Sequence, residues 1–190
     1  MFAETIENEE ILKLPRISYP GEIKVIASED ELNIWLPHLL KSSIIGFDTE
    51  TKPSFKKGHI NGVALLQLAT DELALIIRVA PTGIPKLLVK VFQDSMVLKV
   101  GAAIHDDIKL LQKVKPFKPQ GFIDLQNIAV EKGIENKSVR KLAAIVLNVR
   151  VSKSQQLSNW ESETLTEAQL QYAATDAWIC SEIYKKMILV

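Results

Sequence analysis

Three apolar segments of strand length follow one another in the first half of the chain, at residues 44–49, 62–69 and 72–79. Only Thr70 and Asp71 separate the last two, which is the length of a hairpin turn. Consecutive strands joined by short links pair in antiparallel fashion, because a parallel pair needs a longer crossover. The first half of the chain therefore predicts three antiparallel strands of one sheet.

After Pro81 the pattern changes to alternating helices and strands. The predicted elements are, in chain order, a helix at 84–94, a strand at 97–101, a helix at 104–114, a strand at 121–124 and a helix at 125–132. Such alternation calls for parallel strands connected by right-handed crossovers. The sequence thus predicts an α/β fold, with a mixed five-stranded sheet of three antiparallel and then two parallel strands, flanked by helices.

The segments before and after this region complete the expected domain. Residues 1–21 lack clear periodicity and predict an extended N-terminal arm, whereas residues 22–190 predict one globular domain. Residues 24–27 are a short strand candidate, and the helix after them is expected to begin at Ser28. A further helix is predicted near 138–147.

The last helix is predicted to begin at Thr166, because Gln169 completes a capping box with it.

The composition, 47% hydrophobic and 24% charged, is that of a globular protein. No segment has the apolar length of a signal peptide or a membrane span, so a cytoplasmic protein is expected.

Cysteine and histidine usage excludes some classes of site. Cys180 is the only cysteine, so the chain can form neither an internal disulfide nor a cysteine-based zinc site. The three histidines are scattered through the sequence and make no HxH or HxxxH pair. The net charge of zero argues against a protein that coats nucleic acid by bulk electrostatics, but it leaves room for a local basic groove.

Two carboxylates stand where the first predicted strand ends. Asp48 and Glu50 are two residues apart, so their side chains leave the same face of a strand. Like charges held together in this way repel each other, and a cation must normally compensate them. The alternative is that Asp48 caps a turn while Glu50 points to solvent.

Further acids lie at two other predicted boundaries. Tyr172 and Asp176 are four residues apart in the last helix, so a phenol and a carboxylate share one helical face. Asp106 and Asp107 fall in the first turn of the helix at 104–114, where acids also stabilise the helix dipole. We expect Asp107 to lie nearer the sheet and Asp106 to face solvent.

Three short motifs resemble a known family. FDTE at 47–50, GxxIxxD at 101–107 and YxxxD at 172–176 are similar, in order and spacing, to the three motifs of the DEDD superfamily of 3′-5′ exonucleases. The resemblance covers about 22–188 and includes VALLQLA and the segment from Lys153 to Trp160. Tyr172 assigns the tyrosine subclass, and the sequence leans toward the RNase D and Werner-exonuclease branch. One departure is Asn148, where the family commonly has glycine; asparagine tolerates the left-handed conformation of a helix C-cap.

The resemblance implies a ribonuclease H-like fold and a metal-dependent 3′-5′ exonuclease that releases nucleoside 5′-monophosphates. Two divalent ions, Mg²⁺ or Mn²⁺, would be held by Asp48, Glu50, Asp107 and Asp176, with Asp48 bridging both ions. Tyr172 would orient the attacking water. The expected partner is a nucleic-acid 3′ end, and the Werner-like features favour DNA over RNA.

Candidate substrate contacts are weaker, because a packing or surface role explains each of them as well. They are Thr49, Leu66, Lys109, Arg140 and Lys153. Lys52, Lys56 and Lys57 could steer phosphate from the loop after the first acids, and Trp160 is expected to be a packing anchor.

Three rival hypotheses remain: a catalytically silent module that binds nucleic-acid ends, an RNase D-like RNA-processing enzyme, and a structural α/β protein.

Overall fold

The computed structural model describes residues 2–51 and 61–189. Within these ranges six strands form one sheet in the order β1-β4-β3-β2-β5-β6. Their bounds are Glu22–Ile26 (β1), Ile44–Thr51 (β2), Val63–Ala69 (β3), Leu73–Arg78 (β4), Leu98–Gly101 (β5) and Phe122–Asp124 (β6). The pairs β2–β3 and β3–β4 are antiparallel, and the pairs β2–β5 and β5–β6 are parallel. The mixed α/β sheet expected from the sequence is confirmed.

The sheet has six strands rather than the expected five. The additional strand is β1, which pairs in parallel with β4 at one edge, from Glu22 opposite Leu73 to Ile26 opposite Ile77. The sequence marks residues 24–27 as a strand candidate but gives no sign of its partner. The helix that follows β1 packs against both β1 and β4, so it covers this pair of strands on one face.

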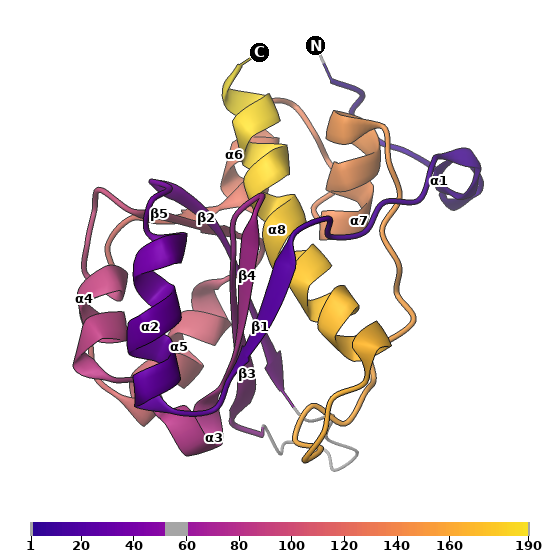
Figure 1. Ribbon diagram of the computed structural model, residues 1–190. Helices are drawn as coiled ribbons and strands as arrows, with labels where there is room; N and C mark the ends of the chain where they lie inside the picture. The colour runs from indigo at the N-terminus through magenta and orange to yellow at the C-terminus, as the bar shows by residue number, and fades with distance from the viewer. Residues whose placement is uncertain (1, 52–60, 190) are drawn as a thin grey trace.

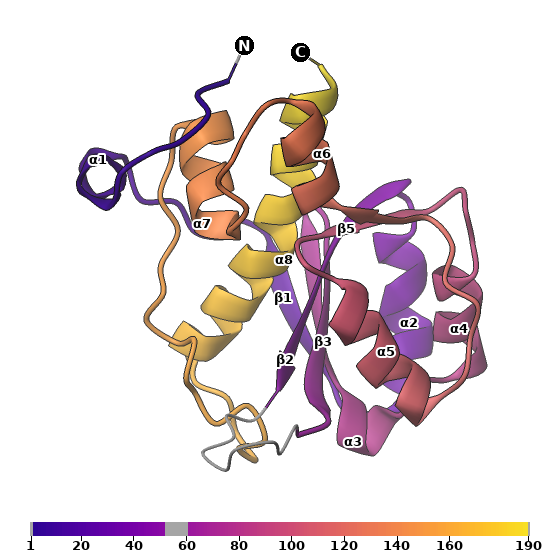
Figure 2. The ribbon, with the colours of Figure 1, turned by 180° about the vertical axis from the view of Figure 1, so that it is seen from behind.

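Helices cover both faces of the sheet (Figures 1 and 2). The helices on one face are α2 (Glu29–Leu39), α3 (Val79–Thr82), α4 (Lys86–Phe92) and α5 (His105–Val114). Those on the other face are α6 (Leu125–Glu131), α7 (Val139–Leu142), the π-helix η1 (Ala143–Leu147) and α8 (Glu167–Ile188). None of the helices within the described residues has the length and hydropathy needed to cross a bilayer.

Several boundaries differ locally from the sequence prediction. The N-terminal arm contains a short helix, α1 (Asn8–Lys13), because Glu7 and Glu10 form a capping box at its start. The helix expected near 138–147 continues as a π-helix in its second half and ends at Asn148, whose φ of 57° and ψ of 39° are left-handed. Asparagine thus supplies the expected C-cap where glycine would otherwise be favoured.

Strand β2 presents two different faces to the two helical layers. Ile45 and Phe47 are fully buried among the helices of the α2 layer. The alternate positions Gly46, Asp48 and Glu50 therefore point toward α8. The alternation places the carboxylates in the same layer as the last helix of the chain.

Helix α8 approaches β2 unusually closely at Gly46. A methyl group on Gly46 would overlap the backbone carbonyl of Ala177. The facing positions of α8, Ala173, Ala174 and Ala177, are small and fully buried. The absence of side-chain bulk on both elements lets the helix backbone rest directly on the strand.

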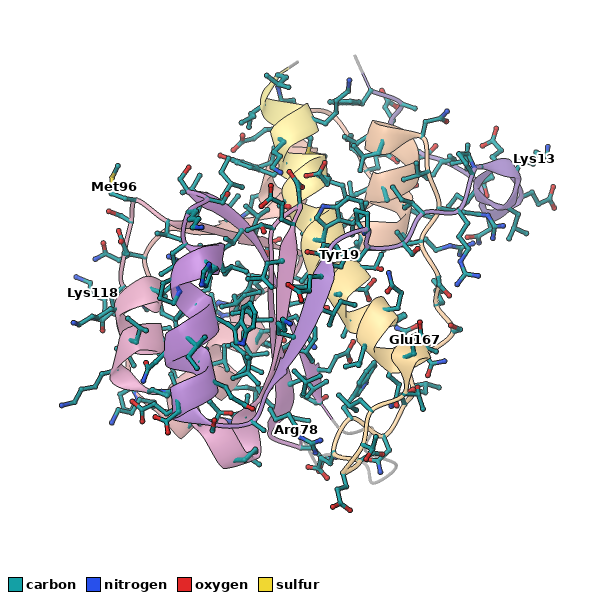
Figure 3. All side chains as sticks on the ribbon, in the orientation of Figure 1. Lys13, Tyr19, Arg78, Met96, Lys118 and Glu167 are labelled. Atoms are coloured by element: carbon teal, nitrogen blue, oxygen red, sulfur yellow. The ribbon has the colours of Figure 1, made fainter. Side chains whose placement is uncertain are left out.

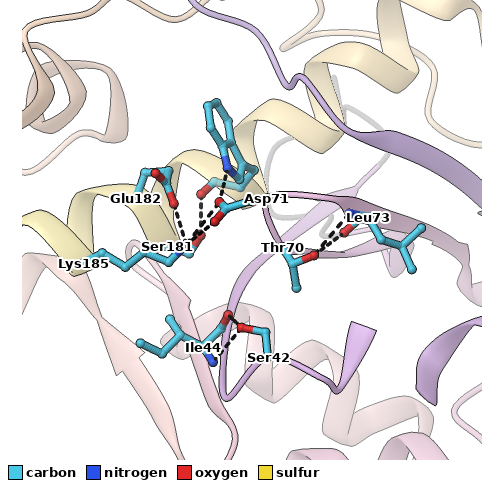
Figure 4. A network of polar contacts seen from close by, with 9 residues as sticks. Ser42, Ile44, Thr70, Asp71, Leu73, Ser181, Glu182 and Lys185 are labelled. Carbon is cyan, nitrogen blue, oxygen red and sulfur yellow. Dashed lines mark hydrogen bonds and ion pairs between the residues drawn. The ribbon is translucent and has the colours of Figure 1, made fainter. Parts of the chain in front are cut away.

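The orientation of α8 is also fixed by polar contacts to the turn between β3 and β4. Asp71 accepts hydrogen bonds from Trp178 Nε1 (3.0 Å) and Lys185 Nζ (2.9 Å). Lys185 pairs in addition with Glu182, one turn earlier in the helix (Figure 4). These contacts fix the rotation of the helix, and hence the direction in which its other side chains point.

Gly46→Ala should lower the free energy of unfolding by about 2 kcal/mol, because overpacking of a close helix–strand contact costs about 1–3 kcal/mol. Urea unfolding monitored by circular dichroism measures the change. The matched control is Gly62→Ala, since a methyl group on Gly62 would meet no other atom within 4 Å. Equal stability of the two variants would contradict the close packing of α8 on β2.

Candidate active site

Three carboxylates from two elements meet above β2. Asp48 and Glu50 come from the strand, and Asp176 comes from α8. One oxygen atom of each lies within 4.8 Å of the others. The strand alternation and the contact at Gly46 together produce this arrangement, since they direct the strand acids at the helix and draw the helix close. The sequence-predicted acids Asp48, Glu50 and Asp176 are thus brought together.

These acids are held in surroundings that oppose their ionisation. Burial, followed by the charges of Asp176 and Asp107, raises the pKa of Glu50 to about 8. Burial likewise raises the pKa of Asp176 to about 7, although a hydrogen bond from Tyr172 acts in the opposite direction. Desolvation, together with the charges of Asp176, Glu50 and Asp107, puts the pKa of Asp48 well above its ordinary value.

No lysine or arginine among the described residues forms an ion pair with these acids. Three converging carboxylates without a cationic partner are the donor set that hard divalent ions such as Mg²⁺ prefer. The residues present therefore fit a divalent metal site, since the positive charge of such an ion would lower the raised pKa values of the carboxylates.

The fourth acid, Asp107, reaches the cluster from the opposite layer. Pairing between β2 and β5 ends at Gly46 opposite Val100, so the edge of β2 beyond this point is open on that side. Helix α5 begins beside this edge, and Thr49 Oγ1 donates a 2.5 Å hydrogen bond to Asp107 Oδ1. The early end of β5 thus admits a side chain that would otherwise be separated from the acids by the sheet.

The environment of Asp107 differs from that of its neighbour Asp106. Burial is the main cause that raises the pKa of Asp107, and its hydrogen bond from Thr49 partly offsets this effect. The Asp107 charge in turn contributes to the raised pKa values of Asp48 and Glu50. The Asp106 side chain is 87% exposed and lies 3.6 Å from Lys109 Nζ, so it faces solvent as expected.

Tyr172 lies one turn before Asp176 on the same face of α8. Burial first, and then the nearby Asp176 carboxylate, raises the pKa of its phenol, so the hydroxyl stays protonated. The ring of Trp160 packs against it, with ring centroids 5.9 Å apart. Trp160 is 1% exposed, which confirms its expected role as a packing anchor.

Gln67 is a site residue that the sequence analysis did not identify. It is fully buried on β3 and lies directly opposite Asp48 in the antiparallel ladder. Neither its amide nitrogen nor its amide oxygen has a hydrogen-bond partner among the described residues. A single glutamine within the apolar run VALLQLA is the sequence signal that could have found it, because an unpaired buried amide is costly.

The substrate-contact candidates fall in different places. Leu66 is fully buried in the α2-side core, on the face of β3 opposite to that of Asp48 and Glu50, and lies directly across the ladder from Thr49; its contact with substrate stays a prediction. Thr49 binds Asp107, and Lys109 pairs with Asp106 in solvent. Arg140 and Lys153 line a hollow of about 230 Å³ that is also lined by Tyr172 and Asp176. Lys52, Lys56 and Lys57 lie outside the described residues.

Comparison with known families bears directly on this site. The family described as 3′-5′ exonuclease matches residues 23–189. The chain belongs to the 3′-5′ exonuclease family. The resemblance drawn from the three short motifs is thereby confirmed at the level of the family.

Solved structures of this family share the fold. The EXO domain of Nibbler from Aedes aegypti is 30% identical, with a TM-score of 0.79 over 90% of each chain. RNase D of Escherichia coli is 24% identical, with a TM-score of 0.78 over 88% of this chain and 44% of that chain, which shows the same fold.

The sequence relatives are longer proteins. Mouse WRN, named a bifunctional 3′-5′ exonuclease/ATP-dependent helicase, is 30% identical over 92% of this chain and 13% of its own length. The chain spans about half or less of the curated relatives that match it over most of its length.

The metal-free protein should lose stability as pH rises from about 5 to about 8. Unfolded carboxyls have pKa values near 4, whereas those of Asp176 and Glu50 in the folded state are about 7 and about 8. Between these limits the folded state binds more protons than the unfolded state, so the free energy of unfolding falls as pH rises through the folded values.

Asp48→Asn should remove part of this repulsion and raise the free energy of unfolding at about pH 8 by about 1–2 kcal/mol. Urea unfolding in EDTA at about pH 5 and about pH 8 measures both effects. Asp106→Asn is the matched control, since this acid is exposed and should change stability little. The same gain from both substitutions would count against strain in the cluster.

Proposed function

We propose that this chain is a metal-dependent exonuclease that hydrolyses phosphodiester bonds from the 3′ end of nucleic acid and releases nucleoside 5′-monophosphates. The observation that carries the proposal is the convergence of Asp48, Glu50 and Asp176 within 4.8 Å, without a cationic partner among the described residues. Membership of the 3′-5′ exonuclease family supports the reaction and its direction.

The four acids would hold two divalent ions, Mg²⁺ or Mn²⁺. The charges of Asp176, Glu50 and Asp107 all act on Asp48, which would be shared by both ions, with Glu50 and Asp176 completing the first set and Asp107 belonging to the second. Such ions supply positive charge for the attacking and leaving oxygens of a phosphodiester and lower the pKa of bound water. Thr49 orients Asp107 through its hydrogen bond, so its role is to position a ligand.

Tyr172 and Gln67 supply the neutral polar groups beside the acids. The protonated phenol of Tyr172 is directed at the Asp176 carboxylate and would orient the attacking water. The Gln67 amide, buried opposite Asp48 without a partner, would donate a hydrogen bond to a carboxylate or a water in the filled site. Both residues position groups without adding charge to an already anionic cluster.

We propose DNA as the preferred substrate, because the sequence from Ser158 to Trp160 is Werner-like and mouse WRN is 30% identical over 92% of the chain. RNA is the competing substrate. Discrimination between them depends on contacts to the sugar 2′ position. Matched DNA and RNA strands, single and recessed, with Mg²⁺ and with Mn²⁺, distinguish the two directly.

A 5′-labelled strand should shorten stepwise from its free 3′ end, and the released product should be a nucleoside 5′-monophosphate. Denaturing electrophoresis and chromatography measure the ladder and the product. Asp48→Asn, which removes the shared ligand, is the inactive control. Cleavage of a circular strand as fast as a linear one would show an endonuclease instead.

Tyr172→Phe should lower the single-turnover rate by about 10²-fold and leave Mn²⁺ affinity nearly unchanged, because the residue orients water and binds no ion in this proposal. The ring persists against Trp160, so stability should change by only about 1 kcal/mol. Rate, Mn²⁺ affinity and melting temperature are measured on one preparation. An unaltered rate removes Tyr172 from the mechanism, and a lost metal site means that it acts as a ligand.

A further inference from the structure

Three adjoining hollows open beside Tyr172 and Asp176 and extend to the N-terminal arm. The first, of about 230 Å³, contains Arg140 and Lys153 in its lining. The second, of about 220 Å³, shares both of these residues and adds Arg16 and Arg150. The third, of about 110 Å³, shares Arg16 with the second hollow and shares Tyr172 and Asp176 with the first. Ser152 lines all three, and we call this continuous depression the basic groove.

The charge of the basic groove is strongly one-sided. The described residues that line it include four cations, Arg16, Arg140, Arg150 and Lys153, and a single acid, Asp176. The whole chain carries equal numbers of acidic and basic residues, 23 of each, so this is a local concentration. None of the four cations forms an ion pair with an acid among the described residues. Their charges are available to an anionic ligand.

The arm is built into this groove through backbone contacts. Arg16 and Arg150 form a parallel β-bridge, in which Arg150 N donates to Pro15 O (2.9 Å) and Ile17 N donates to Arg150 O (3.0 Å). The Arg150 side chain donates from Nε to Leu14 O, also at 2.9 Å. One edge of its guanidinium is thereby fixed by the arm, and its remaining donors are free to bind a ligand.

Two further contacts tie the arm to the helices beside the site. Arg140 Nη1 donates to Asn8 Oδ1 (3.2 Å), so a second groove cation is oriented by the arm. Tyr19 N donates to Thr175 Oγ1 (3.0 Å), one residue before the catalytic candidate Asp176. The arm passes α7 and crosses α8 on its way to β1 (Figures 1 and 2), and Tyr19 marks the crossing in Figure 3.

We infer that the N-terminal arm forms part of the substrate track, and that Arg16 together with Arg140, Arg150 and Lys153 binds the phosphates of nucleotides upstream of the 3′-terminal one. The inference rests on the proposed function, because that function places the 3′ end at the acids. Guanidinium groups suit phosphate oxygens, since they offer several donors in a planar fork. Contacts of this kind go to the backbone of the strand and hold it regardless of base sequence.

Binding of a fluorescent single strand of about 12 nucleotides in EDTA tests the inference without hydrolysis. Arg16→Gln should weaken binding by about 3- to 10-fold and reduce the slope of log affinity against log salt by about 0.7, as for one lost phosphate contact. The variant should fold normally, because the bridge to Arg150 uses backbone atoms. Unchanged melting temperature verifies this.

The matched control is Lys118→Gln, which removes the same charge from an exposed site beyond α4, on the far side of the molecule (Figure 3). It should change the affinity by less than about 2-fold and leave the slope of log affinity against log salt unchanged. Lys153→Gln, in the groove but outside the arm, should act like Arg16→Gln. An equal loss in Lys118→Gln, or no loss in Arg16→Gln, would overturn the role of the arm.

Hydrolysis measured on the same proteins separates this inference from the proposed function. If the wild type releases mononucleotides but Arg16→Gln binds the strand as well as Lys118→Gln does, the exonuclease function is supported and the role of the arm in binding is rejected. Arm-dependent binding with no hydrolysis in Mg²⁺ or Mn²⁺ would support the track and reject the catalytic proposal.

Discussion

The close contact between α8 and β2 at Gly46 is the constraint on which the site depends. The strand can direct Asp48 and Glu50 toward the helix, but only a backbone-to-backbone approach brings Asp176 within reach of them. The same approach concentrates negative charge away from water, where burial raises the pKa of all three acids and repulsion by neighbouring carboxylates raises those of Asp48 and Glu50 further. The close packing therefore makes ionisation of the acids unfavourable, and a bound cation would offset this cost.

The sheet contributes a second constraint through the early end of β5. The pairing of β2 with β5 ends at Gly46 opposite Val100, so the edge of β2 beyond Gly46 is not paired with β5. Asp107 reaches this edge from the α2-side layer. The site therefore collects acids from both faces of one strand. A longer β5 would satisfy more backbone hydrogen bonds and would close this entry.

Much of the fold and most of the acids could be predicted from the sequence, for reasons that are local. Periodicity and capping boxes identify the strands and α8, and the strand alternation puts Asp48 and Glu50 on one face. What could not be predicted is tertiary. The pairing of β1 with β4 joins strands far apart in the sequence, and the burial of Leu66 opposite to Asp48 and Glu50 depends on which face of β3 meets which layer. In the sequence Gln67 is one polar residue of an apolar strand, and only the structure shows that its buried amide has no partner among the described residues.

The order of the elements along the chain has a consequence for synthesis. Asp176 lies on α8, which follows every strand of the sheet, and Tyr19 near the start bonds Thr175 across 156 positions. A growing chain can form the sheet and still lack the helix that completes the acid cluster. The site is therefore assembled last, when both ends of the domain have met. Partly made chains carry the strand acids without Asp176, so the acid cluster would be complete only when folding is finished.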